Sequence, residues 1–162
     1  MIEVSENLLI NADVQTVWAF LTDVEKSLSF NRFHIEIRLP NRFSVNNKSK
    51  FTIIHNLGFG IYKMTAKILN CKPPICLSIS EQTTSNPKRG FSHIITFELE
   101  PKGDMTILTY SLKGTYGRKV QDMSFKPILK GVMIDELRQL KKAIESSQRT
   151  EVDETAKSYN PI

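Results

Sequence analysis

The sequence has no apolar run close to the roughly 20 residues that a membrane-spanning helix needs. Its first residues also lack the basic stretch and the apolar block of an export signal. These two absences lead us to expect a cytoplasmic protein without integral membrane association. Cysteine is scarce too, since Cys71 and Cys76 are the only two, and in a reducing compartment we expect both to be free structural thiols.

Motifs of catalysis and of cofactor binding are absent as well. There is no HExxH or GxSxG pattern, no glycine-rich phosphate loop and no group of Cys and His at metal-ligand spacing. The formal net charge is +5, but the lysines and arginines are scattered and form no basic run with interleaved aromatic residues. We therefore expect no metal, no cofactor and no nucleic-acid partner.

What the chain does contain is a long series of strand-like segments. In one of the clearest, Phe33, Ile35 and Ile37 alternate with His34 and Glu36, which is the two-residue period of a strand with one buried face. Similar patterns predict strands over residues 2–10, 33–39, 51–54, 61–70, 75–83, 91–99 and 106–113. Because short turns join most of them, we expect an antiparallel meander and an α+β fold.

Helical patterns lie near the two ends of the chain. A short helix is expected from Val14 behind Asp13 as its N-cap, followed by a second short helical segment over 23–29. A long amphipathic helix is predicted over 124–147, with Ser124 as N-cap and Pro127 in the first turn, where a missing N–H is tolerated. Its apolar stripe comprises Leu129, Val132, Met133, Leu137, Leu140 and Ile144. The polar residues 148–162 are predicted to be a disordered tail, which leaves 1–147 as one domain.

Residues 9–23 resemble the opening of the START-like (SRPBCC) superfamily, in its polyketide cyclase/dehydrase and lipid-transport branch. Members typically begin with a strand, a small residue and a helix that carries Val-Trp or Val-Tyr and is closed by Leu-x-Asp. Here Val17-Trp18 and Leu21-Thr22-Asp23 fit that pattern. The resemblance implies a helix-grip fold, in which a curved antiparallel seven-stranded sheet wraps a long C-terminal helix. It also implies a cavity between sheet and helix, where the function would lie.

The three histidines differ in their predicted positions. His34 is expected to point outward and His55 to lie at a strand end, so only His93 is expected to face the interior. There it would act as a general base, as an orienting hydrogen-bond donor, or simply as a neutral histidine bonded within the fold. No carboxylate is placed beside it, because Glu81 ends the fifth strand and Glu98 faces away by strand alternation.

An apolar cavity with a few polar groups is the usual form of a small-molecule site. The residues expected to line it are Phe33, Ile35, Tyr62, Met64, His93, Phe97, Tyr110, Leu129, Val132 and Met133. Simple core packing is the alternative for each of them.

Three functional hypotheses follow from this reasoning. The first is binding of a small hydrophobic or amphipathic ligand, lipid- or polyketide-like, in the cavity. The second is an enzyme of the cyclase/dehydratase type, which would use His93 and tyrosines such as Tyr62 or Tyr110 to move protons on a polyketide-like substrate. The third is a protein-interaction or chaperone-cofactor role. The identity of the ligand and the oligomeric state stay open.

Overall fold

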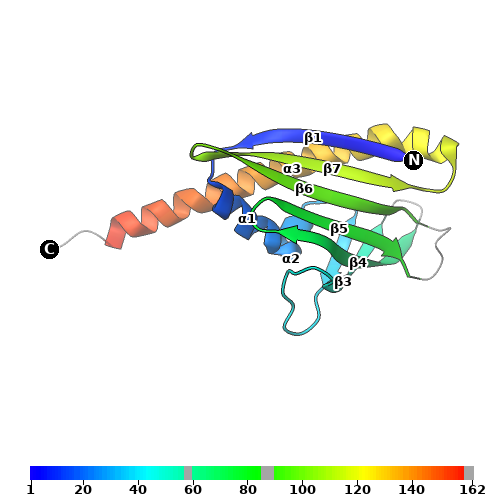
Figure 1. The fold of residues 1–162 in the computed structure, drawn as a ribbon, viewed down its shortest axis with the longest axis horizontal. Coiled ribbons are helices and arrows are strands. Elements are labelled where there is room, and N and C mark those ends of the chain that lie inside the picture. Colours follow the sequence, from blue (N-terminus) through cyan, green and yellow to red (C-terminus); the bar gives the residue numbers. More distant parts are fainter. Residues whose placement is uncertain (57–59, 85–89, 159–162) are drawn as a thin grey trace.

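The computed structural model describes residues 1–56, 60–84 and 90–158, with side chains described up to residue 148. It confirms the predicted order of elements, which Figure 1 shows along the chain. The strands are β1 (Ile2–Ile10), β2 (His34–Arg38), β3 (Lys50–Asn56), β4 (Ile61–Lys72), β5 (Cys76–Thr83), β6 (Ser92–Lys102) and β7 (Met105–Thr115). The helices are α1 (Val14–Thr22), α2 (Val24–Leu28) and α3 (Lys119–Ser158).

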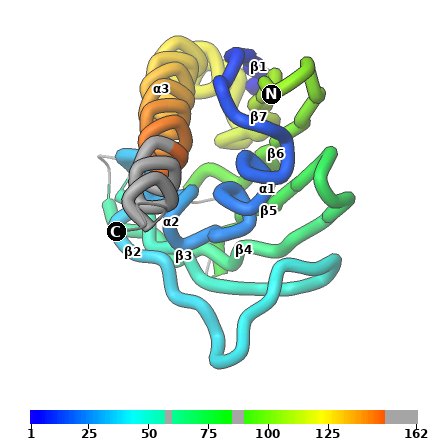
Figure 2. Tube along the Cα trace, turned by 90° about the vertical axis from the view of Figure 1, so that its left-hand side faces the viewer, coloured from blue at the N-terminus to red at the C-terminus, as the bar shows by residue number. Residues whose placement is uncertain are grey.

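One antiparallel sheet contains all seven strands, in the order β1-β7-β6-β5-β4-β3-β2. Strands β2 to β7 each pair with their neighbours in sequence, as the short connections predict. The first strand pairs with the last, from Ile2 opposite Gly114 to Ile10 opposite Thr106. Figure 2 shows the sheet curving around α3, with α1 and α2 on the same inner side. The expected helix-grip architecture is therefore confirmed.

Asp13 begins α1, as predicted. Its carboxylate accepts hydrogen bonds from the backbone N–H groups of Gln15 at 2.9 Å and Thr16 at 3.1 Å. These are two of the amide groups that have no partner within the helix itself. On the following turns Val17 is buried, and Trp18 is partly buried against the core. The apolar residues Val17 and Trp18 of the segment that resembles the START-like opening thus pack toward the interior.

The long helix α3 begins earlier than predicted. It starts at Lys119, so Ser124 is not its N-cap but donates its hydroxyl to the carbonyl oxygen of Val120 at 3.0 Å, and Pro127 lies inside the helix. The early start is explained by Asp122, which is in the first turn. Its carboxylate accepts a hydrogen bond at 2.8 Å from the backbone N–H of Tyr116, and an acidic group is favourable at a helix N-terminus.

At its other end α3 continues to Ser158, through the stretch 148–158 that was expected to belong to a disordered tail. Six of the eleven residues 148–158 are glutamate, lysine, arginine, glutamine or alanine, all good helix formers. The rest of the predicted tail, residues 159–162, lies outside the described residues. The predicted apolar stripe is confirmed, since all its members are buried. No helix in the described part of the chain is long and apolar enough to cross a membrane.

The predicted alternation fails in β2. His34 pairs with His55 and Glu36 with Ile54, so Ile35 is an extra residue at a register shift, which is a β-bulge. As a result Ile35 and Glu36 both face outward, and Ile35 is 54% exposed. The side chain of His34, in contrast, is only 2% exposed. The prediction that His34 points outward and Ile35 inward is therefore wrong.

The two thiols agree with expectation. Cys71 and Cys76 are both free and lie near the turn that joins β4 and β5.

Candidate functional site

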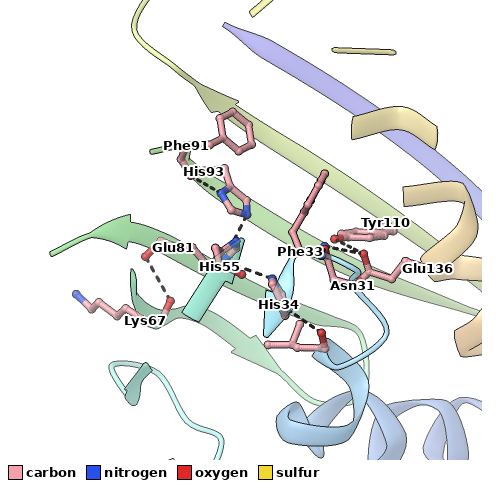
Figure 3. A network of polar contacts seen from close by, with 12 residues as sticks. Asn31, Phe33, His34, His55, Lys67, Glu81, Phe91, His93, Tyr110 and Glu136 are labelled. Carbon is pink, nitrogen blue, oxygen red and sulfur yellow. Dashed lines mark hydrogen bonds and ion pairs between the residues drawn. The ribbon is translucent and has the colours of Figure 1, made fainter. Parts of the chain in front are cut away.

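The inner side of the sheet carries a buried polar group of four side chains, which we call the histidine–glutamate cluster (Figure 3). It consists of His34 of β2, His55 of β3, Glu81 of β5 and His93 of β6. Oε2 of Glu81 lies 2.7 Å from Nε2 of His55, 3.6 Å from Nε2 of His93 and 3.8 Å from Nε2 of His34. The chain has three histidines, and all of them face this one carboxylate.

Strand alternation and register bring these residues together. His55 and Glu81 each continue an inward-facing series on their strands that is otherwise apolar. The register sets His34 opposite His55 and Glu81 opposite His93. On the other side of Glu81 its neighbour on β4 is Ala66, so a methyl group rather than a large side chain flanks the carboxylate.

Backbone carbonyl groups fix the orientation of two imidazole rings. Nδ1 of His34 lies 2.7 Å from the carbonyl oxygen of Leu28, and Nδ1 of His93 lies 2.8 Å from that of Phe91. A carbonyl oxygen can only accept a hydrogen bond, so Nδ1 carries the hydrogen in both rings. In their neutral forms both rings therefore direct the lone pair of Nε2 toward Glu81.

Burial and attraction set the charges of the cluster. Burial lowers the pKa of His34 to about 4, in spite of the attraction of Glu81, and burial likewise lowers the pKa of His93. For Glu81 burial favours the neutral acid, but attraction to His93 and the hydrogen bond from His55 outweigh it and lower its pKa to about 2. At neutral pH an anionic carboxylate thus faces two neutral imidazoles.

A second buried carboxyl group comes from α3. Glu136 is 1% exposed, and its Oε2 accepts hydrogen bonds from Nδ2 of Asn31 at 3.0 Å and from the hydroxyl of Tyr110 at 3.3 Å (Figure 3). Burial, reinforced by the charge of Glu81, raises the pKa of Glu136 to about 8, so this carboxyl is mostly protonated at neutral pH. Its Oε1 has no partner among the described residues. Because Oε2 accepts both hydrogen bonds, we place the proton on Oε1, where it is available to a further acceptor.

The residues predicted to line a ligand site are only partly brought together. Met64, His93, Phe97, Tyr110, Leu129, Val132 and Met133 are buried. Phe33 and Tyr62 are partly buried and pack against the core. Ile35 does not join them, because the bulge turns it outward. That the inward-facing residues contact a ligand stays a prediction.

Sequence reasoning misses most of the polar site. From the sequence alone no carboxylate is placed beside His93, whereas in the structure Glu81 is its cross-strand neighbour. His55 does lie near the end of its strand, but it is 3% exposed and belongs to the interior. The sequence did indicate that His55 and Glu81 face inward, because each lies two residues after a buried apolar residue of its strand. Glu136 likewise lies four residues after Val132, on the apolar face of the helix.

Gly114 leaves the space that His93 occupies. A Cβ atom at Gly114 would lie 2.5 Å from Cβ of His93 and 2.8 Å from the carbonyl oxygen of Ser92, both inside van der Waals contact. We expect Gly114→Ala to lower the free energy of unfolding by about 1 to 3 kcal/mol through overpacking. Urea denaturation would measure the loss, and the ring NMR signals of His93 should shift.

The matched control for this substitution is Gly131→Ala on α3, where an added Cβ meets no atom within 4 Å. An alanine is favourable in a helix, so this variant should not lose stability. A Gly114→Ala protein as stable as Gly131→Ala, with unshifted His93 signals, would show that position 114 has room for a methyl group beside His93.

Comparison with known proteins agrees with this fold. The family described as polyketide cyclase / dehydrase and lipid transport matches residues 1–145. Among solved structures, a conserved protein from Geobacillus kaustophilus is similar with a TM-score of 0.70 at 18% identity, covering 90% of this chain and 97% of that one. The protein TTHA0849 from Thermus thermophilus has a TM-score of 0.67 at 11% identity, covering 90% and 98%.

A biosynthetic protein is similar as well. The di-domain ARO/CYC StfQ from the steffimycin biosynthetic pathway has a TM-score of 0.68 at 15% identity, covering 92% of this chain and 52% of that one. No curated protein matches the sequence. At such identities the solved structures show a shared fold alone, whereas the family match spans residues 1–145 of the 162-residue chain. It confirms the resemblance found in residues 9–23, and the chain therefore belongs to the polyketide cyclase/dehydrase and lipid-transport family.

Proposed function

We propose that this protein binds a small amphipathic molecule, with a lipid- or polyketide-like apolar body, between the sheet and α3. Family membership supports this proposal. So does the character of the inner surface, where Met64, Phe97 and Met133 are apolar and buried. Methionine side chains adapt their shape to an apolar partner, which suits a ligand that enters between packed elements.

The observation that carries the proposal is the unpartnered oxygen of Glu136. A buried polar atom without a partner is uncommon in native proteins, and a bound molecule can supply the partner that the protein does not. Oε1 of Glu136 has no partner among the described residues, and it belongs to a carboxyl that is mostly protonated at neutral pH. A carbonyl or hydroxyl oxygen of the ligand would accept the proton of Glu136, while the rest of the ligand would contact the apolar residues.

The neutral fluorescent ketone Prodan is a suitable probe, because it joins an aromatic body to one carbonyl acceptor and its emission reports a nonpolar site. We expect wild-type protein to bind it and Ala66→Phe to lose binding, since Ala66 is fully buried on the inner face of β4 and phenylalanine would fill the interior. Glu136→Leu should raise the dissociation constant about tenfold, which corresponds to one lost hydrogen bond. Glu136→Gln keeps a donor and should bind nearly normally.

Two matched variants control this experiment. Lys63→Phe places the same ring on the exposed side of β4, and Asp135→Asn neutralises the exposed carboxylate next to Glu136. Both should bind Prodan as the wild type does. The proposal is overturned if folded Ala66→Phe binds Prodan with unchanged affinity, or if wild-type protein shows no binding at all.

A second candidate, an acid–base enzyme on a polyketide-like substrate, is favoured by the pair of His55 and Glu81. With Nε2 and Oε2 at 2.7 Å, His55 would accept a proton from a bound substrate and Glu81 would stabilise the resulting imidazolium. Tyr110 would act only as a hydrogen-bond donor, because burial raises its pKa well above the ordinary value. This candidate fails if a co-purified molecule, identified by native mass spectrometry, is recovered unchanged after incubation with the protein.

A further inference from the structure

We propose that the histidine–glutamate cluster is a binding site for a divalent transition-metal ion of the Zn²⁺ type, held by His34, His55 and Glu81, with His93 as an additional ligand. This inference goes beyond the proposed function, because it concerns residues of β2, β3, β5 and β6 and requires no organic ligand. Nothing in the sequence pattern predicts it, since the four residues are far apart along the chain.

The centre of the cluster holds more hydrogen-bond acceptors than hydrogen-bond donors. His34 and His93 direct the Nε2 lone pairs of their neutral rings toward Glu81, because their Nδ1–H groups are held by backbone carbonyls. Nε2 of His34 and Oε1 of Glu81, both deeply buried, have no hydrogen-bond partner among the described residues. Buried acceptors that face one another repel, and a cation bound between them would remove this repulsion.

The atoms that would bind the metal ion are spaced as metal ligands are. Ligands at about 2.1 Å from a tetrahedral metal ion lie about 3.4 Å from one another. Nε2 of His93 and Nε2 of His34 lie 3.6 and 3.8 Å from Oε2 of Glu81, close to that separation. The donor atoms of His34, His55 and Glu81 all lie within 4.8 Å of one another.

His55 needs a small change to become a ligand. At present its Nε2 donates to Glu81 over 2.7 Å, which is shorter than the separation of two ligands on one metal ion. Metal binding would replace this hydrogen bond. The imidazole of His55 would carry its hydrogen on Nδ1 instead, so that Nε2 offers a lone pair and a neutral ring keeps its number of protons.

Two of the imidazole rings are already held in place by neighbouring groups. Metal-bound histidines usually donate their other N–H to a carbonyl or carboxylate, which fixes the ring. The carbonyl groups of Leu28 and Phe91 already do this for His34 and His93. The ring of Phe91 also stacks on His93, with centroids 4.8 Å apart and planes inclined by 14°. The site is therefore organised before any ion enters.

The donor set selects the class of metal. Imidazole nitrogens with one carboxylate suit zinc and other first-row divalent ions, whereas Mg²⁺ and Ca²⁺ prefer oxygen ligands throughout. No thiolate is needed, and Cys76 lies at the opposite end of β5 from Glu81.

The test uses the 162-residue chain described here, freed of metal by chelation and then titrated with Zn²⁺ or Co²⁺. We expect one Zn²⁺ per chain by isothermal titration calorimetry, and visible absorption bands from bound Co²⁺. Because the chain has three histidines and all belong to the cluster, every histidine ring signal in the NMR spectrum should move on Zn²⁺ binding. If the cluster binds only protons, the histidine ring signals will change with pH but will not move when Zn²⁺ is added. That result would overturn the proposal.

Variants separate this site from adventitious surface binding. Glu81→Gln and His34→Asn each remove a ligand, so each should weaken Zn²⁺ binding by at least about 100-fold. Losing only a group that hydrogen-bonds to a ligand already weakens metal binding by up to about 100-fold. Glu136→Gln is the matched buried control and should bind Zn²⁺ normally. Unchanged Zn²⁺ affinity in both ligand variants would show that Zn²⁺ does not bind at the histidine–glutamate cluster. If either variant fails to fold, the visible absorption spectrum of the wild type with Co²⁺ still tests the proposal, because missing Co²⁺ bands would contradict it. Prodan binding tests the other site separately.

Discussion

Replacing Glu81 by leucine is expected to lower the free energy of unfolding at pH 7 by about 3 to 5 kcal/mol, the usual effect of removing one partner from a buried polar or ionic group. Glu81 is fully buried and accepts the hydrogen bond of His55 at 2.7 Å. Leucine accepts no hydrogen bond, so His55 would keep a buried donor without a partner. The other two rings would lose the anion that they face.

The isosteric change Glu81→Gln should cost less, about 1 to 3 kcal/mol, because the amide oxygen still accepts from His55 while the charge is lost. Urea denaturation of wild type and variants gives both differences. The measurements need a chelator in every sample, because a bound metal ion would add its own binding free energy to the stability of the wild type.

Glu98→Leu is the control for an added apolar side chain, since Glu98 lies on the exposed face of β6 and little change is expected. Replacing a whole buried ion pair by apolar residues is often harmless, but here only one member is replaced. A Glu81→Leu protein at least as stable as the wild type would show that the histidines do not depend on the carboxylate.

Much of the fold follows from local patterns. Strand alternation, short connections and the Asp13 cap predict the elements, because each depends on residues that are near in sequence. The extent of α3 is less predictable. Its start depends on Asp122, whose carboxylate bonds to the end of β7 through Thr115 and to the N-terminal amine of Met1, and only the second of these contacts is remote in sequence.

The polar site depends on two features that one strand does not reveal. The first is the bulge at Ile35, which reverses the predicted direction of His34. The second is the register of the four strands β3 to β6, which brings His55, Glu81 and His93 to one place although β4 lies between β3 and β5. Strand alternation by itself predicts that His55 and Glu81 face inward, so their direction could have been found from the sequence. That they contact each other depends on how the strands pair in the sheet, which the sequence of one strand does not show.

Glu136 is expected to give the protein a stability that falls as pH rises from about 4.5 to about 8. Its pKa is raised by burial from 4.5 to about 8, so between these values the folded state keeps a proton that the unfolded state releases. Stability falls wherever the folded state binds more protons than the unfolded state. The contribution of Glu136 should therefore be complete below pH 4.5 and decline by roughly 1 to 1.5 kcal/mol per pH unit up to pH 8.

Two other buried groups, His34 and Glu81, change the stability of the protein with pH in the opposite direction. The pKa of His34 is lowered from 6.5 to about 4 and that of Glu81 from 4.5 to about 2, so their stabilisation is lost as pH falls through those ranges. Tyr110 stays protonated throughout, because burial raises its pKa, and Asn31 carries no charge. The wild-type curve alone therefore mixes these opposing contributions.

The difference between Glu136→Gln and wild type isolates the effect. Glutamine is a neutral isostere, so this variant should gain stability relative to the wild type between pH 4.5 and 8, by several kcal/mol in total, and the difference should be constant above pH 8. Urea denaturation at intervals of one pH unit measures it. A difference that stays flat between pH 5 and 8 would mean that Glu136 ionises freely in the folded protein.

Tyr110→Phe provides a sharper control for the same titration. The hydroxyl of Tyr110 lowers the pKa of Glu136 by donating to its Oε2, so removing that hydroxyl should extend the declining range of stability above pH 8. The ¹³C signal of the Glu136 carboxyl would show both midpoints directly. Because ionised Glu136 has no proton to donate, Prodan binding by the wild type should weaken above pH 8, and Glu136→Gln should not follow it.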